Sequence, residues 1–170
     1  MKASKFIVLA GGILGILAFF LPLVTVERHG MQVSVSAFQV VKGLDAVQDA
    51  ANTKEAKAEI AKLGAEGRKF VREADDSLDK IKGIVLAVFA PALLLAVIGG
   101  LGVSRKKFGR GAGALALLLG LLGLGIGAIL KGAAEGDSGI GITVLLLTGV
   151  AGIVGGIMAI AKPERATAAA

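Results

Sequence analysis

Residues 83–103 read GIVLAVFAPALLLAVIGGLGV, residues 104–110 read SRKKFGR, and residues 111–130 read GAGALALLLGLLGLGIGAIL. The two long segments contain no charged side chain, whereas the short one between them carries four basic residues: Arg105, Lys106, Lys107 and Arg110. An α-helix rises about 1.5 Å per residue, so about 20 apolar residues cross a hydrocarbon core about 30 Å thick. This pattern predicts two membrane-spanning helices joined by a basic loop.

Two more apolar segments of similar length lie at residues 6–24 and 139–161. Inside a bilayer, only a helix satisfies every backbone hydrogen-bonding group within one segment. The sequence therefore predicts an all-α membrane protein built as a four-transmembrane-helix bundle. Lys2 and Lys5 before the first segment also resemble the start of a signal peptide. The length of that segment and the lack of an Ala-x-Ala cleavage site favour a retained span.

The composition agrees with a membrane protein and excludes several functions. Hydrophobic residues make up 55% of the chain, 26 residues are glycine, and the mean hydropathy is +0.79. The chain has no cysteine, so disulfides and thiolate metal sites are impossible. Its net charge is +6, but it has no Trp, no Tyr and no basic face that could stack on bases, so nucleic acid is not a predicted partner.

The positive charge is distributed unevenly between the two sides of the predicted membrane. The loop of residues 104–110 carries four net positive charges, and the tails at residues 1–5 and 162–170 carry two and one. In contrast, residues 25–82 hold ten basic and ten acidic residues, and residues 131–138 have a net charge of −1. The positive-inside rule therefore predicts a multi-pass protein of the cytoplasmic membrane, with both termini in the cytoplasm and the large first loop outside.

The large loop opens with a pattern typical of a β-hairpin. Residues alternate between valine and polar side chains on both sides of His29 and Gly30, which suit a two-residue turn. His29 is interpreted as a turn residue rather than a metal ligand, since no second ligand lies near it in the sequence. The predicted pairs are Val24 with Val35, Thr25 with Ser34, and Val26 with Val33.

Helical patterns follow the hairpin. Ser36 and Gln39 have the spacing of a capping box at a helix start. Apolar residues then recur on one helical face at Val40, Leu44, Val47 and Ala51.

A break is predicted at residues 64–67, which read GAEG. A second apolar stripe after the break continues into the next span, so that helix is predicted to project beyond the bilayer. We expect the hairpin and these helices to form an extracytoplasmic cap. The second stripe consists of Phe70, Ala74, Leu78, Ile81 and Val85.

Small residues spaced by four recur inside the spans and predict close contacts between helices. Two interpretations stay open: these residues pack the four helices of one chain, or they join copies of the chain. Pro91 lies within the second span and predicts a kink, because proline removes one helical hydrogen bond. The candidate packing residues are Gly11, Gly15, Gly109, Gly113, Ala116, Gly120, Gly123, Gly127, Ala151, Gly152, Gly155 and Gly156.

The four predicted spans contain no Asp, Glu, Lys, Arg or His, the side chains on which proton relays and ion-coupled transport depend. No catalytic, cofactor-binding or metal-binding motif is present, so an enzyme is not predicted, a lipid-modifying one included. The sequence favours a structural, self-assembling or accessory subunit of a membrane complex, with lipid and other subunits as partners. The alternative is a channel or transport component whose pathway forms between subunits.

The order of parts resembles the claudin-type tetraspan arrangement: a first span, a large outer loop of strands and helix, an extended second span, a basic inner loop and two further spans. The resemblance covers the whole chain as topology alone. Claudins carry a tryptophan and cysteine signature in the first loop that this chain lacks, so their disulfide-braced strands and junctional adhesion do not carry over. The sequence FFLPLV at residues 19–24 and the Ala, Gly, Leu and Val bias are similar to small bacterial membrane proteins.

Overall fold

The computed structural model describes residues 3–28, 31–105, 108–134 and 137–162. This part of the chain is mostly helical, with one two-stranded antiparallel sheet. The elements are, in chain order, α1 (Ala3–Phe20), β1 (Pro22–Arg28), β2 (Met31–Ser36), α2 (Ala37–Ala51), α3 (Lys54–Lys62), α4 (Ala65–Ser104), α5 (Arg110–Ala133) and α6 (Ile140–Ala161).

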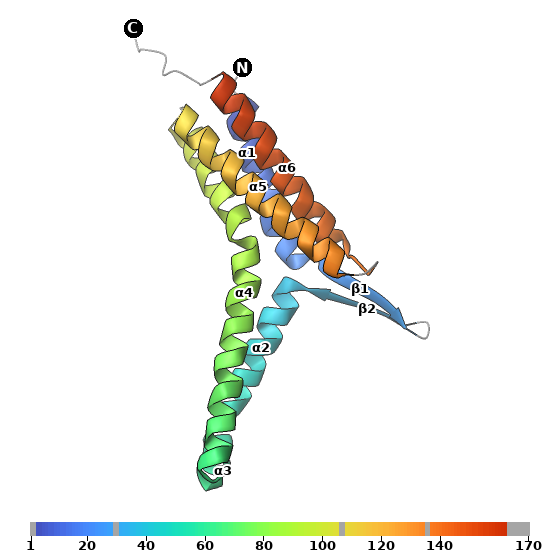
Figure 1. Ribbon diagram of the computed structural model, residues 1–170, viewed down its shortest axis with the longest axis vertical. Helices are drawn as coiled ribbons and strands as arrows, with labels where there is room; N and C mark the ends of the chain where they lie inside the picture. The colour runs from blue at the N-terminus through green and yellow to red at the C-terminus, as the bar shows by residue number, and fades with distance from the viewer. Residues whose placement is uncertain (1–2, 29–30, 106–107, 135–136, 163–170) are drawn as a thin grey trace.

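The molecule has two parts that share α4 (Figure 1). In the first part, which we call the bundle, α1, α5 and α6 lie beside residues 83–104 of α4. In the second part, the arm, α2 and α3 lie along residues 65–82 of α4, which extend away from the bundle. The hairpin of β1 and β2 leaves the same end of the bundle in another direction.

Four helices are long and apolar enough to cross a membrane: α1, α5, α6 and residues 71–104 of α4. Each of them overlaps one of the four predicted spans, so a multi-pass membrane protein is supported. Within the bundle, α1 contacts both α4 and α6, and α6 packs along α5. The contact between α4 and α5 is less extensive, which leaves one seam of the bundle only partly closed.

The first helix begins and ends a few residues earlier than the span predicted at residues 6–24. It ends at Phe20, and residues 22–24 of the predicted span belong to β1 instead. Pro22 explains the difference, because proline disfavours helical backbone at the residue before it and has no N–H to donate. The chain turns into the strand after Leu21 N donates a hydrogen bond to Ala18 O, with an N–O distance of 3.3 Å.

The predicted hairpin register is confirmed at all three pairs: Val24 with Val35, Thr25 with Ser34, and Val26 with Val33. The predicted turn residues His29 and Gly30 lie outside the described residues. The pairing of β1 with the connection between α5 and α6 was not predicted. Thr25 N donates to Asp137 O at 2.9 Å, and Gly139 N donates to Leu23 O at 2.7 Å.

Gly139 is required at this junction. A Cβ atom built on Gly139 would lie 2.2 Å from Pro22 O, and one built on Gly141 would lie 2.8 Å from the same oxygen. Because the close neighbour is backbone, a side chain at either position would force the strand away from α6.

The predicted capping box at the start of α2 is confirmed. Ser36 Oγ accepts a hydrogen bond from Gln39 N at 3.2 Å, and Gln39 Oε1 accepts one from Ser36 N at 2.9 Å. The structure adds a break at Asn52 and Thr53 that was not predicted; Thr53 caps α3. The predicted break at residues 64–67 falls slightly earlier, at Leu63 and Gly64.

The fourth helix continues without interruption for 40 residues, so it is about 60 Å long, twice the thickness of a hydrocarbon core. Its length agrees with the predicted projection beyond the bilayer. Pro91 lies inside the helix and is buried. The kink at Pro91 stays a prediction, as does the side of the membrane on which the arm lies.

Polar contacts hold α2 against α4 along the arm. Gln48 Nε2 donates to Asp79 Oδ1 at 2.7 Å, and Asp45 forms an ion pair with Lys82. At the base of the arm, the ring of Phe19 meets the rings of Phe38 and Phe89, with centroid distances of 6.2 and 5.2 Å. The arm is therefore fastened at its base by aromatic rings and along its length by polar side chains.

Candidate functional site

The seam between α5 and α6 brings backbone against backbone. A Cβ atom built on Gly120 would lie 2.6 Å from Ile153 N and 2.8 Å from Gly149 O. One built on Gly113 would lie 3.0 Å from Gly156 O, and one built on Gly152 would lie 3.2 Å from Ala116 O. Only glycine permits contacts this close, so these small residues set the distance between the two helices.

The first helix uses small residues in the same way on two sides. A Cβ atom on Gly11 would lie 2.6 Å from Ala151 Cβ on α6, and one on Gly15 would lie 2.3 Å from Ala92 Cβ on α4. On α6, a Cβ atom at Gly155 would lie 2.5 Å from Val8 Cγ2. These three glycines fix α1 between α4 and α6.

Two close contacts between α1 and α4 involve glycines outside the predicted set. A Cβ atom on Gly12 would lie 2.2 Å from Ala96 N, and one on Gly99 would lie 2.5 Å from Leu9 N. Gly12 has no small residue four positions before or after it, so the spacing pattern did not single it out.

Other predicted packing residues have looser surroundings. A Cβ atom on Gly127 would lie 2.9 Å from Leu146 Cδ2, and one on Gly123 would lie 3.8 Å from Pro91 Cβ. Gly109 does not lie at a helix contact, because it precedes α5 and no atom would lie within 4 Å of its Cβ. All the close contacts named here lie within one chain, so packing inside the bundle is sufficient to explain these small residues.

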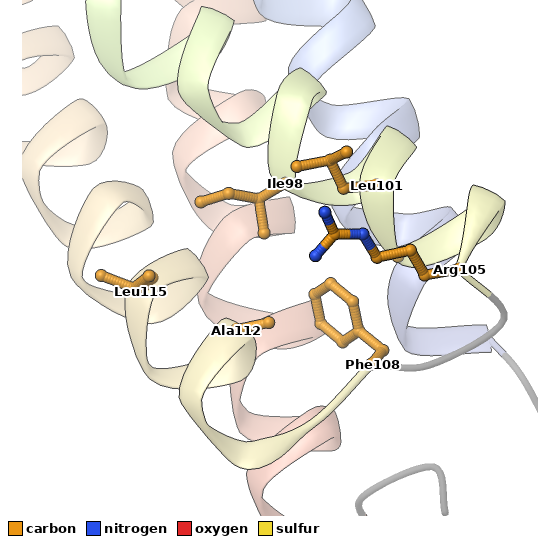
Figure 2. Close-up of a pocket in the computed structure, with 7 residues that line it drawn as sticks. Ile98, Leu101, Arg105, Phe108, Ala112 and Leu115 are labelled. Atoms are coloured by element: carbon orange, nitrogen blue, oxygen red, sulfur yellow. The ribbon is translucent and has the colours of Figure 1, made fainter. Parts of the chain in front are cut away.

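A pocket of about 240 Å³ lies in the less closed seam between α4 and α5, beside the basic loop. Figure 2 shows the guanidinium of Arg105 near the side chains of Leu101 and Phe108. Phe108 itself is fully buried, with its ring against Gly102. The lining residues are Ile98, Leu101, Gly102, Arg105, Phe108, Ala112 and Leu115. The pocket thus combines apolar walls with one permanent cation.

The four residues predicted to determine topology are not all placed by the structure. Arg105 follows α4 and lines the pocket, and Arg110 is the exposed first residue of α5. Lys106 and Lys107 lie outside the described residues. Lys5, predicted to belong to the cytoplasmic tail, instead lies within α1 and is only 3% exposed. The sequence shows that Lys5 is basic, but no sequence pattern predicted that it is buried.

A second groove, of about 430 Å³, lies between α1 and α4 near the base of the arm. Its lining consists only of apolar residues: Ile16, Phe19, Phe20, Leu86, Phe89, Ala90, Leu93 and Leu94. Such a surface suits lipid chains and offers no group that could hold or activate a substrate.

The described residues contain no group of three His, Cys, Asp or Glu side chains that could hold a metal ion. The buried hydroxyl of Thr148 donates to Val144 O at 3.0 Å, in its own helix. This back-bonding satisfies the hydroxyl within its own helix.

No protein-family model matches this sequence, and neither a curated protein nor a solved structure matches the chain. The four apolar helices are consistent with a tetraspan protein, and no match supports a specific family.

Proposed function

We propose that this chain is a non-enzymatic multi-pass membrane protein that serves as a structural, self-associating subunit of a membrane complex and joins its neighbours through the arm. The observation that carries the proposal is that large apolar side chains on the arm remain exposed. Val47 on α2 is 54% exposed, Ile81 on α4 is 46% exposed and Leu63 after α3 is 44% exposed.

Exposed apolar side chains have a different meaning in the two parts of the molecule. On the bundle they face lipid, and no partner is needed to cover them. On the arm, which is predicted to lie in water, apolar side chains that gather at one place favour a protein interaction there. Near its far end, the arm also carries a groove of about 260 Å³ whose walls include Val47, Ile60, Val71 and Leu78.

A second copy of the chain fits this surface in charge as well as in polarity. Residues 25–82 hold equal numbers of basic and acidic residues, so two arms do not repel each other through net charge. The arm is also continuous with a span, because α4 runs unbroken from Ala65 to Ser104. An arm fixed to a span in this way holds its apolar surface at a defined place relative to the membrane.

The test is the mass of the purified protein in mild detergent, compared between two variants of α2. We expect the unmodified chain to form dimers or larger assemblies and Val47→Asp to be monomeric, since the aspartate places a charge within the apolar stripe. Lys42→Asp is the control. It changes the charge more, but it lies about 140° around the helix from Val47. A monomeric unmodified chain, or a Val47→Asp variant with unchanged mass, would contradict the proposal.

The placement of the arm outside the cytoplasm is tested by labelling single cysteines. The chain has no native cysteine, so Lys54→Cys in α3 and Arg110→Cys in α5 each report one site. We expect a membrane-impermeant maleimide added to intact cells to label the first variant and not the second. The reverse result would contradict the predicted topology, because it would place the arm in the cytoplasm.

A channel formed between subunits remains the alternative function. In the described bundle, glycine contacts close the seams of α1 with α4, α1 with α6 and α5 with α6, so the alternative places the pathway between copies of the chain. Flux measurements on liposomes that contain the assembled protein distinguish the two functions. A structural subunit leaves ions and small solutes trapped at every protein density, whereas a channel releases them in proportion to that density.

A further inference from the structure

We propose that the pocket between α4 and α5 binds the headgroup phosphate of an anionic phospholipid, with the acyl chains lying against the same seam. This binding site is separate from the arm, and it does not depend on self-association.

The pocket has a charged end and an apolar end, and the predicted membrane boundary lies between them. Arg105 and Phe108 belong to the predicted basic loop, whereas Ile98 and Leu115 belong to the predicted spans on either side of it. A ligand that fills the pocket must therefore be amphiphilic, with an anion next to hydrocarbon. A phospholipid has this arrangement, and a free phosphate ion does not use the apolar walls.

The charge around the pocket is complementary to an anion. Arginine presents planar N–H donors in a geometry that matches two phosphate oxygens at once. The chain has no Asp or Glu between residues 80 and 134, so neither helix of the seam carries a carboxylate beside Arg105. Arg110, the exposed first residue of α5, is a further cation of the described residues that follow Arg105. Basic pockets between transmembrane helices on the cytoplasmic side are known to hold anionic headgroups.

The pocket is also open to a lipid. Nothing lies within 4 Å of a Cβ atom built on Gly109 or Gly111, so the approach along the start of α5 is clear. Leu115 and Leu101, on the walls, are 55% and 46% exposed, which leaves them in contact with whatever fills the seam. The seam is the least extensive contact between neighbouring helices of the bundle, so a lipid chain enters it without separating two packed glycine faces.

Native mass spectrometry of the detergent-purified chain tests the proposal. The chain is titrated with phosphatidylglycerol, with phosphatidylcholine of the same acyl chains, and with glycerophosphoglycerol, which is the anionic headgroup without chains. Both lipids carry the phosphate, but phosphatidylcholine also carries a quaternary ammonium that Arg105 repels. We therefore expect phosphatidylglycerol to bind about tenfold more tightly than phosphatidylcholine. The headgroup alone should bind weakly, because it leaves the apolar walls empty.

Four variants distinguish the effect of the Arg105 charge on lipid binding from the effect of the shape of the pocket. Arg105→Gln should abolish the preference for phosphatidylglycerol, and Arg105→Lys should restore part of it. Ala112→Leu narrows the pocket without a change of charge and should reduce the binding of both lipids. Lys131→Gln is the matched control, since it removes one charge from the other end of α5 and should leave the preference unchanged. Thermal unfolding in detergent verifies that each variant is folded.

Retention of the full preference by Arg105→Gln would overturn the proposal, as would equal loss in Lys131→Gln, which would indicate a general effect of net charge. Binding of the headgroup alone as tightly as the whole lipid would also overturn it, because the occupant would then be a soluble phosphate.

Discussion

The bundle and the arm share one helix, α4, yet they are held together in different ways. In the bundle, helices approach until backbone meets backbone, and core residues such as Val8, Leu95 and Ala116 are almost fully buried. In the arm, α3 has no buried residue, and Ala37 alone is buried in α2. Polar contacts there include those of Gln48 with Asp79 and of Asp45 with Lys82.

The difference follows from the solvent that each part is predicted to face. In lipid, burial of apolar side chains gains little, so helices associate through close packing and small residues are needed where they touch. In water, the same stripe of apolar side chains drives association, and exposed polar pairs add little to it. The stability of the bundle therefore depends on how closely its helices approach. The stability of the arm depends on its helix caps and on its partly buried apolar side chains.

The largest expected effect is at Gly120 in the bundle. Gly120→Leu places a side chain against the backbone of α6, which has no room to move aside. We expect the free energy of unfolding to fall by about 3 kcal/mol. Thermal or denaturant unfolding of the purified protein in detergent measures the loss.

Gly125→Leu is the matched control, because it makes the same substitution on the same helix where nothing lies within 4 Å. It should change stability by less than about 0.5 kcal/mol. Equal losses at both positions would contradict a specific contact at Gly120, because leucine has a higher helix propensity than glycine and only crowding can cause a loss.

A smaller effect is expected at the start of the arm. Ser36→Ala removes the hydroxyl that accepts a hydrogen bond from Gln39 N, and it should destabilise α2 by about 1 kcal/mol. Hydrogen exchange at the amides of the first turn of α2 should become faster, while exchange in α5 and α6 stays the same.

Ser34→Ala makes the same change in the exposed hairpin, where the side chain lies 3.4 Å from Thr25 Oγ1. It should leave the first turn of α2 unaffected. Faster exchange throughout the bundle in the Ser36→Ala variant would show that the arm and the bundle unfold as one unit, and the comparison of two independently stabilised parts would fail.

The smallest effect is expected at the ion pair of Asp45 and Lys82, whose side chains are both partly exposed. Asp45→Asn should lower the unfolding midpoint of the protein by about 1 °C or less at low salt, and not at all at high salt, because solvent and ions screen such pairs. Unfolding curves recorded at two salt concentrations test this. A loss that persists at high salt would show that the pair acts as a buried contact between α2 and α4.

The sequence determined the features that depend on local pattern. Runs of uncharged apolar residues indicated four spans, because the thickness of a bilayer fixes the length of helix that crosses it. Alternating valines predicted the register of the hairpin, since a shift by one residue would reverse its faces. Ser36 and Gln39 predicted the start of α2, because a capping box involves only residues within one turn.

The tertiary structure decided which surfaces meet. Spacing by four marked a ridge of small residues on a helix, but it did not show which helix the ridge contacts. Gly12 was missed because no small residue lies four positions from it, and Gly109 was included although it precedes α5. The pairing of Thr25 with Asp137 joins segments distant in sequence. The burial of Lys5 depends on how the helices pack around α1, and the pocket beside Arg105 depends on how α5 lies against α4. Such contacts depend on the relative positions of whole helices, and no local pattern in the chain records those positions.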